Sequence, residues 1–350
     1  MTRLLKTGIL GATGAVGQKL LQLLEDHPLF KVTSLYASEK SAGKPYREAV
    51  TWRAPGHMPE KFGDLVVAPC RPDEKLDLVF SALPKEQAVT VEPAFAAAGI
   101  PVVSNASAFR MGDDIPLVIA ELNPEHTALV ETQKKNRGWP GFIITNPNCA
   151  TIGLAIPLMA LDQAFGVELV SVVTMQARSG AGYPGPSDEV IGDNVLPYIG
   201  GEEDKLETEP QKILGTLKNG GITPSRMTLS AACHRVDVMD GHFEAISVSF
   251  KNKPASADAV EAALVSFQGK VADMGLYSSP DPLIQVHQDV TRPQPKLDRM
   301  VGGGMTTHVG RIRACPVMDY KMVILSHNTI RGAAGAALLN GELLAAQGLI

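Results

Sequence analysis

The sequence lacks several features that would place it in particular classes of protein. It has four cysteines in 350 residues, 5% aromatic residues and a net charge of only −5. It contains no stretch of apolar residues long enough to predict a transmembrane helix, and its N-terminus does not resemble a signal peptide. No concentrated basic segment occurs either, so we expect neither nucleic acid nor a membrane surface as a partner.

The cysteines are far apart and show no Cys-x-x-Cys spacing. Cys70, Cys149, Cys233 and Cys315 are therefore expected to be free thiols in a reducing, cytoplasmic compartment. Cys233 and His234 are adjacent and cannot easily face one metal ion, so we expect no metal site.

The first third of the chain alternates short β-type runs with helical patterns, which predicts a parallel sheet with crossover helices. We expect strands at 7–10, 31–37, 76–81, 100–104 and 142–145, and helices at 14–26 and 87–98. The segment 43–58 has no clear period and is expected to lie on the domain surface.

The pattern changes after Cys149. A helix is expected at 149–163, long β-type runs at 167–177, 227–234 and 242–250, and a helix at 255–268. These runs predict a larger antiparallel sheet in an α+β catalytic domain, and the helical segment 328–346 is expected to return to the first domain. The predicted fold class is thus α/β: a Rossmann-type parallel domain, residues 1–148 and 329–350, and a catalytic domain, residues 149–328.

Gly11, Gly14 and Gly17 follow the first predicted strand and open the first predicted helix. Glycines at this position let backbone N–H groups and the helix N-terminus approach a pyrophosphate. The Gly-x-x-Gly-x-x-Gly spacing in this context predicts a dinucleotide site, and a tight turn without a ligand is the alternative.

The end of the second predicted strand bears on which nicotinamide cofactor binds. NAD sites usually place an acid there for the ribose hydroxyl. Here Ser38 and Ser41 can donate to a 2′-phosphate and Lys40 is nearby, whereas Glu39 counts against this reading. The sequence favours NADP.

Cys149 lies between a predicted strand and a predicted helix. Asn148 is suited to cap the helix, and a thiol in the first helical turn is expected to have a lowered pKa and to act as a nucleophile. A buried structural cysteine is the alternative, and we accept it for the other three.

A thiolate that adds to an aldehyde gives a thiohemiacetal, which loses hydride to become a thioester that phosphate attacks. This chemistry needs a proton shuttle near the sulfur, oxyanion donors and an anion site. His242, in a bend between two predicted strands, is the preferred shuttle. His234, within a predicted strand, is the rival.

Six segments in this order resemble the aspartate-semialdehyde dehydrogenase family over nearly the whole chain. They are residues 11–17, 104–111, 146–151, 209–214, Arg235 with His242, and 328–335. Asn-Pro-Asn-Cys at 146–149 resembles the fungal and archaeal branch. The resemblance implies a second domain of the glyceraldehyde-3-phosphate dehydrogenase-like type and a homodimer or homotetramer.

The resemblance also implies roles for individual residues. Cys149 would be the nucleophile and His242 the acid/base, Gln176 would orient the substrate, and Asn148 with the Cys149 backbone would hold the oxyanion. The residues implied for substrate binding are Arg235 for a carboxylate, Glu209 for an ammonium group, and Arg110 and Lys212 for phosphate. Glu209 and Lys212 also fit a simple pair on a helix surface. The residues implied for cofactor binding are Gly11, Thr13, Gly14, Ala15, Val16, Ser38, Ser41, Ser81, Ser179, Gly180, Gly182 and Asn328.

The resemblance implies the NADPH-dependent reductive dephosphorylation of 4-phospho-L-aspartate to L-aspartate 4-semialdehyde, in lysine, threonine and methionine synthesis. The same thioester chemistry also suits a malonyl-CoA reductase, which is the alternative. A cofactor-binding regulator without catalysis is a third hypothesis, but it would not need Cys149, His242 and Gln176 together.

Overall fold

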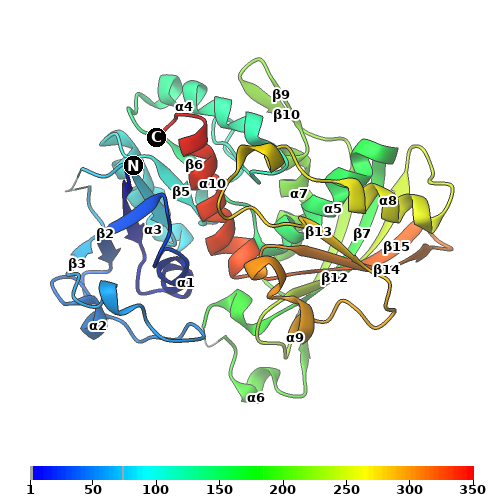
Figure 1. The fold of residues 1–350 in the computed structure, drawn as a ribbon, viewed down its shortest axis with the longest axis horizontal. Helices are drawn as coiled ribbons and strands as arrows, with labels where there is room; N and C mark the ends of the chain where they lie inside the picture. Colours follow the sequence, from blue (N-terminus) through cyan, green and yellow to red (C-terminus); the bar gives the residue numbers. More distant parts are fainter. Residues whose placement is uncertain (1–2, 73–74, 184) are drawn as a thin grey trace.

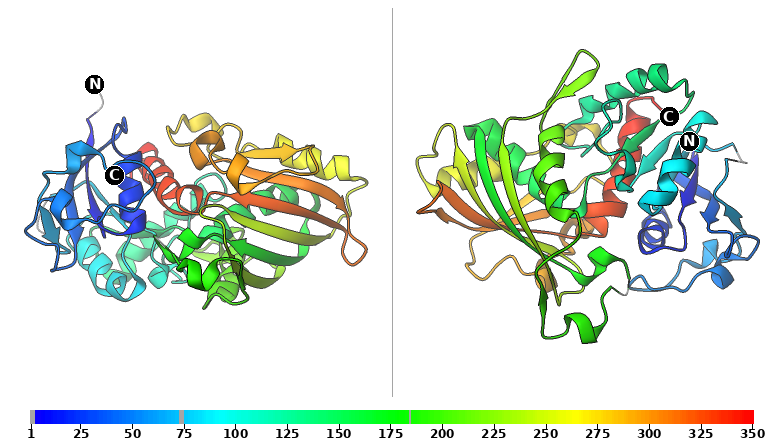
Figure 2. Two further views of the ribbon diagram at one scale, coloured as in Figure 1. Left: turned by 90° about the horizontal axis from the view of Figure 1, so that it is seen from below. Right: turned by 180° about the vertical axis from the view of Figure 1, so that it is seen from behind.

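The computed structural model describes residues 3–72, 75–183 and 185–350, which form two domains side by side (Figure 1). One domain is built on a six-stranded sheet and the other on a seven-stranded sheet. The C-terminal helix, red in Figure 1, lies between the two sheets although it is the last element of the chain, and Figure 2 shows the same arrangement from two further directions.

The first sheet is parallel throughout and has the order β3-β2-β1-β4-β5-β6. Its strands are β1 (Leu5–Leu10), β2 (Phe30–Ala37), β3 (Val67–Pro69), β4 (Leu78–Ser81), β5 (Val102–Ser104) and β6 (Ile143–Thr145). This confirms the predicted Rossmann-type domain. The strand order reverses between β1 and β4, and open parallel sheets bind ligands at such a switch point.

The helices of the first domain are α1 (Ala15–Leu23), α2 (Tyr46–Ala49), α3 (Lys85–Ala97), α4 (Leu129–Arg137) and α10 (Gly335–Ala346). α10 begins later than predicted because residues Ile330–Ala334 form one turn of π-helix. Gly341 lets α10 approach the first sheet, since a Cβ there would lie only 2.9 Å from the ring of Phe80. The last segment therefore returns to the first domain, as predicted.

The second sheet has the order β13-β14-β15-β12-β7-β11-β8. Its strands are β7 (Val167–Gln176), β8 (Val195–Leu196), β11 (Thr228–Val236), β12 (His242–Phe250), β13 (Ile284–His287), β14 (Thr307–Ala314) and β15 (Tyr320–Ser326). β7 pairs parallel with β11 and β13 with β14, so the expectation of a purely antiparallel sheet is wrong. The chain between β7 and β11 holds two helices and a hairpin, which gives the long crossover that parallel pairing needs.

Helices α5 (Cys149–Phe165), α7 (Glu202–Ile213) and α8 (Ala257–Ser266) share one apolar core with the second sheet. The smaller elements of this domain are α6 (Asp188–Ile191), α9 (Pro295–Asp298), β9 (Thr216–Lys218) and β10 (Gly221–Thr223). Leu169 and Val173 of the central strand β7 remain exposed. Among the residues that the structure describes, no helix combines the length and the apolar character needed to cross a membrane.

Candidate active site

Cys149 begins helix α5, directly after the loop that follows β6. Asn148 caps this helix, because its Oδ1 accepts hydrogen bonds from the backbone N–H groups of Ala150 (2.9 Å) and Thr151 (3.3 Å). The predicted N-cap is therefore confirmed. The cap places the thiol in the first helical turn, where the helix dipole favours negative charge.

His242, the first residue of β12, faces Cys149. Its Nε2 lies 3.1 Å from the cysteine Sγ, and its Nδ1 accepts a 3.1 Å hydrogen bond from the backbone N–H of Ala177. Because a neutral imidazole has one proton, the bond from Ala177 assigns that proton to Nε2. The ring therefore presents an N–H donor to the sulfur. The rival His234 lies with its Nδ1 3.3 Å from the carbonyl oxygen of Thr174.

Burial governs the protonation of the cysteine and histidine. It raises the pKa of the Cys149 thiol to about 12, and Glu202 adds to this shift. Burial also lowers the pKa of His242 to about 3, with a contribution from Arg235. At pH 7 the pair is thus a neutral thiol and a neutral imidazole. The expectation of a lowered thiol pKa is wrong for this buried site, because lost hydration outweighs the helix dipole.

A cavity of about 320 Å³, the catalytic cavity, opens beside Cys149 between the two domains. Its charged lining consists of Lys85, Arg110, Glu202 and Lys205. Three cations and one carboxylate suit a ligand with more than one anionic group and a single ammonium group. The other lining residues are Ala15, Val16, Leu83, Asn105, Ala106, Ser107, Asn148, Cys149, Ser179, Gly180, Gly182, Asn328, Thr329, Gly332 and Ala333.

Glu202 is a buried carboxylate of the catalytic cavity that the sequence analysis did not select. It accepts hydrogen bonds from Asn148 Nδ2 (2.8 Å), Gln176 Nε2 (3.3 Å) and Lys205 Nζ (2.6 Å). Burial raises the pKa of Glu202, but Lys205 and the two amides outweigh burial and hold this pKa below its usual value. The cavity therefore contains a carboxylate that stays ionised.

The side-chain amide of Asn148 is occupied at both ends, by the helix cap and by Glu202. This geometry gives Asn148 a structural role, and its oxyanion contact stays a prediction. The backbone N–H of Cys149 is different, because N–H groups in a first helical turn have no acceptor within the helix. Gln176, at the end of β7, donates to Glu202, and its contact with the substrate stays a prediction.

Glu209 and Lys212, the two substrate ligands predicted on α7, do not line the catalytic cavity. Glu209 accepts hydrogen bonds from Arg110 Nη1 (2.9 Å) and from the backbone N–H of Asn148 (2.6 Å). Lys212 Nζ donates to three backbone carbonyl oxygens of the segment 110–115, at 2.7, 2.7 and 2.8 Å. Their polar atoms thus bond to the protein in this structure, and substrate binding by Glu209 and Lys212 stays a prediction.

The two predicted arginines both act electrostatically on Cys149, and each lowers the pKa of its thiol against the effect of burial. Arg110 lines the catalytic cavity and donates through Nη2 to the carbonyl oxygen of Asn105 at 2.8 Å. Arg235, near the end of β11, donates through Nη1 to the carbonyl oxygen of Ala177 at 2.8 Å. Gly180 packs directly against it, and a Cβ at Gly180 would overlap the guanidinium. A larger residue there would push Arg235 out of the site.

The glycine loop between β1 and α1 has the close backbone approaches that a dinucleotide site needs. Gly11 has a φ of +78°, and a Cβ there would lie 2.7 Å from the carbonyl oxygen of Ala82. A cavity of about 260 Å³ lies over the loop and is lined by Thr13, Gly14, Ala15, Gln18, Thr51, Arg53 and Tyr183. Ala15 lines both cavities, and Ala15 with Val16 brings the glycine loop to the border of the catalytic cavity. These residues fit a nicotinamide dinucleotide.

The predicted serines occupy different positions around the glycine loop. Ser38 is exposed and Ser41 is half-buried in the turn after β2, where Ser41 N–H donates to Ser38 O at 2.8 Å. Glu39, which counted against NADP, lies 3.3 Å from Arg71, but the two side chains are 74% and 73% exposed, so this pairing is weak. Ser81 is fully buried at the end of β4 and does not line either cavity.

Asn328 and Gly332 position the loops around the nucleophile. Asn328 donates to Ser179 Oγ (2.9 Å) and accepts the backbone N–H of Gly241 (2.8 Å), which links the loop of Ser179 to the residue before His242. Gly332, in the π-helical turn, contacts Cys149 so closely that a Cβ there would lie 2.7 Å from the cysteine Cβ. Gly332 was not predicted, and its only signal was a glycine inside a helix-forming segment.

Within the described part of the chain, one group of side chains has the spacing of a metal site. His287, Asp298 and His308 bring their ligand atoms within 4.8 Å of one another. However, Arg292 donates hydrogen bonds to both oxygens of Asp298. The carboxylate is thus already neutralised, and the group does not offer a cation a free ligand set.

Comparison with known proteins matches each half of the chain to a domain of the same family. Residues 6–130 match the family model described as semialdehyde dehydrogenase, NAD binding domain, and residues 158–331 match semialdehyde dehydrogenase, dimerisation domain. The aspartate-semialdehyde dehydrogenase of Archaeoglobus fulgidus is 50% identical over 344 residues, covering 98% of each chain. That of Candida albicans is 45% identical over 361 residues, covering 99% of each.

A solved structure shows the same fold. The crystal structure of aspartate-semialdehyde dehydrogenase with NADP from Candida albicans superimposes with a TM-score of 0.92 at 44% identity. The match covers 99% of this chain and 100% of the other. The resemblance to archaeal and fungal relatives that the sequence motifs indicated is therefore confirmed.

Proposed function

Because the chain belongs to the aspartate-semialdehyde dehydrogenase family, we propose that it reduces 4-phospho-L-aspartate to L-aspartate 4-semialdehyde through a thioester on Cys149. The observation that supports this proposal is the 3.1 Å distance between His242 Nε2 and Cys149 Sγ. Cys149 stands at the start of a helix and lines a cavity that extends to the glycine loop. A nucleophile with a hydrogen-bonding partner beside a dinucleotide loop is what this acyl chemistry requires.

Cys149 carries the acyl group. Its sulfur attacks the acyl carbon of the substrate, a C–S bond replaces the C–O bond to phosphate, and the thiol proton moves to the departing phosphate oxygen. NADPH, when bound, supplies the hydride that converts the thioester to a thiohemiacetal oxyanion. When the C–S bond then breaks, the aldehyde leaves and the sulfur takes a proton from solvent to become a thiol again.

His242 acts through the proton on Nε2. The hydrogen bond from the backbone N–H of Ala177 to Nδ1 keeps the ring proton on Nε2, which faces the sulfur. Nε2 therefore also faces the oxygen of an acyl group bonded to that sulfur. Nε2–H therefore donates a hydrogen bond to the oxyanion, together with the backbone N–H of Cys149. It then donates a hydrogen bond to the thiolate that departs, before this thiolate takes its proton from solvent. Gln176 orients the substrate from the end of β7.

Charged residues of the cavity, together with Arg235 behind its lining residue Gly180, match the groups of the substrate. Arg235 holds the α-carboxylate, since its planar guanidinium fits a carboxylate with two parallel hydrogen bonds. Glu202 holds the ammonium group, and Arg110 with Lys205 holds the phosphate. Glu202 and Lys205 are thus proposed for these roles beside Glu209 and Lys212, for which the same roles stay a prediction.

The cofactor is NADP, the cofactor named with the Candida albicans structure. Thr13, Gly14, Ala15 and Val16 line the path from the glycine loop to Cys149. On the far side of that path, Ser179, Gly180, Gly182 and Asn328 border the catalytic cavity. Ser38 and Ser41 bind the 2′-phosphate, and efficiency with NAD equal to that with NADP would contradict this assignment.

One assay separates this reaction from its alternatives. Formation of NADPH is followed with aspartate semialdehyde, NADP and phosphate, and oxidation of NADPH is then followed with malonyl-CoA. We expect turnover only in the first assay. Turnover only with malonyl-CoA would make the protein a malonyl-CoA reductase, and no turnover in either would favour a regulator.

Substitution of the nucleophile and its partner tests the mechanism. Cys149→Ala should abolish turnover, and His242→Ala should lower kcat by about 10²–10³-fold, the usual loss for an oxyanion donor. Cys233→Ala is the matched control, because this buried cysteine lies outside the catalytic cavity. Full activity of the Cys149 variant would end the thioester mechanism.

The open face of the second sheet is the surface on which we expect two copies of the chain to associate as a homodimer, or as pairs within a homotetramer. Leu169 and Val173 of β7 are 48% and 39% exposed there, and the dimerisation-domain match includes this strand. Val173→Asp should give a monomer by light scattering, whereas Val190→Asp on α6 should leave the mass unchanged. An unchanged mass for Val173→Asp would place the interface elsewhere.

The compartment follows from the same chemistry. A nucleophilic thiol works only while it is reduced, and all four cysteines are free thiols. We infer a reducing, cytoplasmic location.

A further inference from the structure

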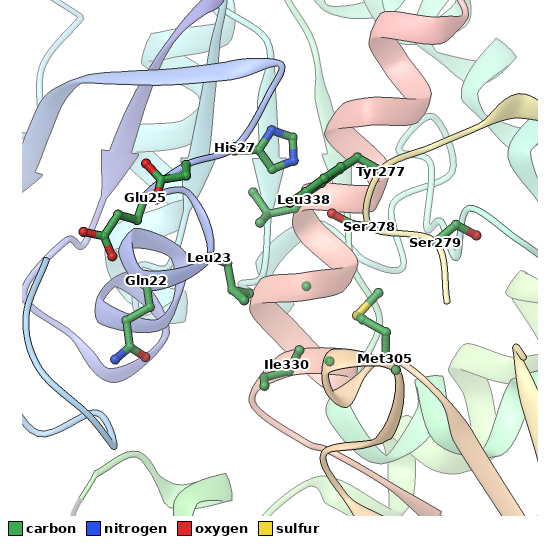
Figure 3. Close-up of a pocket in the computed structure, with 14 residues that line it drawn as sticks. Gln22, Leu23, Glu25, His27, Tyr277, Ser278, Ser279, Met305, Ile330 and Leu338 are labelled. Atoms are coloured by element: carbon green, nitrogen blue, oxygen red, sulfur yellow. The ribbon is translucent and has the colours of Figure 1, made fainter. Parts of the chain in front are cut away.

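Two further cavities where the domains meet differ in charge. One, of about 460 Å³, lies between α1 and α10 on one side and segments 277–279 and 302–305 on the other (Figure 3). None of the described residues that line it is a lysine or an arginine. The other is the cavity of about 260 Å³ over the glycine loop, which we call the glycine-loop cavity. Its described lining residues include one arginine, Arg53, and no acid, so it suits an anion.

Gln18 of α1 fixes the main chain that carries Arg53. Its side-chain Oε1 accepts hydrogen bonds from the backbone N–H groups of Arg53 (2.8 Å) and Ala54 (3.0 Å). Its Nε2 donates to the carbonyl oxygens of Thr13 (2.9 Å) and Thr51 (3.1 Å). Because Gln18 is buried and Thr13 belongs to the glycine loop, one buried amide joins the chain around Arg53 to that loop.

The guanidinium of Arg53 is held from the second domain, although the residue itself is exposed. Its Nη1 donates to the carbonyl oxygen of Tyr183 at 3.2 Å, and the phenol of Tyr183 donates to Asp240 Oδ1 at 2.8 Å. Arg53 forms no ion pair with any residue that the structure describes. A guanidinium has five N–H donors, so donors remain for a ligand in the cavity. The structure thus holds a positive charge beside the glycine loop.

The lining of the glycine-loop cavity indicates which phosphate Arg53 meets. Thr13 and Gly14 line the same cavity, and N–H groups at such a helix start face a pyrophosphate. Ser38 and Ser41, proposed above for the 2′-phosphate, do not line it. A pyrophosphate is anionic at both phosphates, whereas a helix N-terminus supplies only about half a positive charge. A cation beside the loop therefore adds to the attraction.

We propose that Arg53 is a further cofactor-binding residue and binds the pyrophosphate of the nicotinamide cofactor. The inference rests on the function proposed above, which supplies the cofactor, and adds a residue that the sequence motifs did not indicate. Arg53 keeps its hydrogen bond to Tyr183 and offers its remaining N–H groups to the phosphate oxygens. It contacts no reacting atom, so its loss should weaken cofactor binding and leave the chemical step unchanged.

Cofactor binding is measured by calorimetry on the full chain with NADP and, separately, with NAD, which lacks the 2′-phosphate. Arg53→Met should raise the Kd of both by the same factor, about fivefold, the upper end for an exposed charge pair. An unchanged Kd for NADP would overturn the proposal. A loss confined to NADP would also overturn it, because Arg53 would then bind the 2′-phosphate.

Two other variants control for the loss of charge. Arg47→Met removes an arginine of α2 that pairs with Asp64 and lines neither cavity, so both Kd values should stay unchanged. Arg53→Lys keeps the positive charge and should weaken binding less than Arg53→Met does. Thermal melting shows whether each variant is folded. Equal losses in Arg47→Met and Arg53→Met would mean that any arginine of this domain has the same effect, and would overturn the proposal.

Salt gives a second measurement that needs no turnover. Because salt screens exposed charges, added KCl should weaken NADP binding to the wild-type protein more than to Arg53→Met. The same salt dependence in both proteins would contradict a contact between Arg53 and phosphate.

Failure of the proposed function would give a different result. If the wild-type protein did not bind NADP, the proposed function would fail and this inference with it. If the wild-type protein bound NADP and turned over aspartate semialdehyde, but Arg53→Met bound NADP equally well, only the role of Arg53 would fail.

Discussion

Helix α7 carries two pairs with the same Glu-x-x-Lys spacing, and they do different things. Both pairs bond to neighbouring groups of the protein, but Glu202 and Lys205 line the catalytic cavity whereas Glu209 and Lys212 do not. Seven residues are about two helical turns, so both pairs lie on one face of the helix, about 10 Å apart along its axis. The segment 110–115 covers only the second pair. Spacing identifies the face of a helix, but what packs on each turn decides which residues can meet a ligand.

The largest expected difference between the two Glu-x-x-Lys pairs is in the free energy of unfolding. Lys212→Met leaves three buried carbonyl groups without their donor, so we expect the free energy of unfolding to fall by about 3–5 kcal/mol. Lys205→Met, at the partly exposed pair, should cost under about 1 kcal/mol. Urea unfolding of the two variants measures the difference. Equal losses would show that the pairs are structurally equivalent.

The next difference is in kcat/KM, which should depend more on Glu202 and Lys205 than on Glu209 and Lys212. Lys205→Met and Glu202→Gln each remove a charge that we propose to contact the substrate, so kcat/KM should fall by about 10²-fold, within the usual cost of truncating one partner of a buried charge pair. The folded fraction of each variant is checked by circular dichroism. If Lys205→Met kept the wild-type kcat/KM, Lys212 and not Lys205 would be the lysine that binds the phosphate.

The pH dependence gives the smallest expected difference. Lys205 helps to hold the pKa of Glu202 below its usual value, against the effect of burial. Its loss in Lys205→Met therefore raises this pKa, and the acid limb of kcat/KM should move to higher pH by about one unit. Lys218→Met, at an exposed position on β9, is the control and should not move the limb. An unmoved limb in Lys205→Met would mean that Glu202 does not titrate in the reaction.

The parts of the site that could be predicted from the sequence are those set by neighbours in the chain. The glycine loop before α1 and the Asn148 cap on Cys149 depend on a few consecutive residues. His242 could be predicted because a bend between two strands is a local pattern. These residues meet in the structure as expected.

The remaining features depend on contacts between distant segments. The choice between Glu202 and Glu209 depends on where the segment 110–115 packs, and the parallel pairing of β7 with β11 depends on the long connection between them. The high thiol pKa of Cys149 likewise arises from burial by both domains and from Glu202. No local pattern in the sequence carries that information.

The position of α10 has a consequence for how the chain is made. Leu338 and Leu344 complete a core with Ile9, Leu35 and Phe80, residues that leave the ribosome hundreds of positions earlier. Until the last residues emerge, α1 packs in this core through Leu20 and Leu21, but the part that α10 fills stays uncovered. Domains often fold in order as they are synthesised, but here the first domain has to wait for the second. Folding of the cofactor domain is therefore completed only after synthesis ends, and a chain that stops before α10 cannot close it.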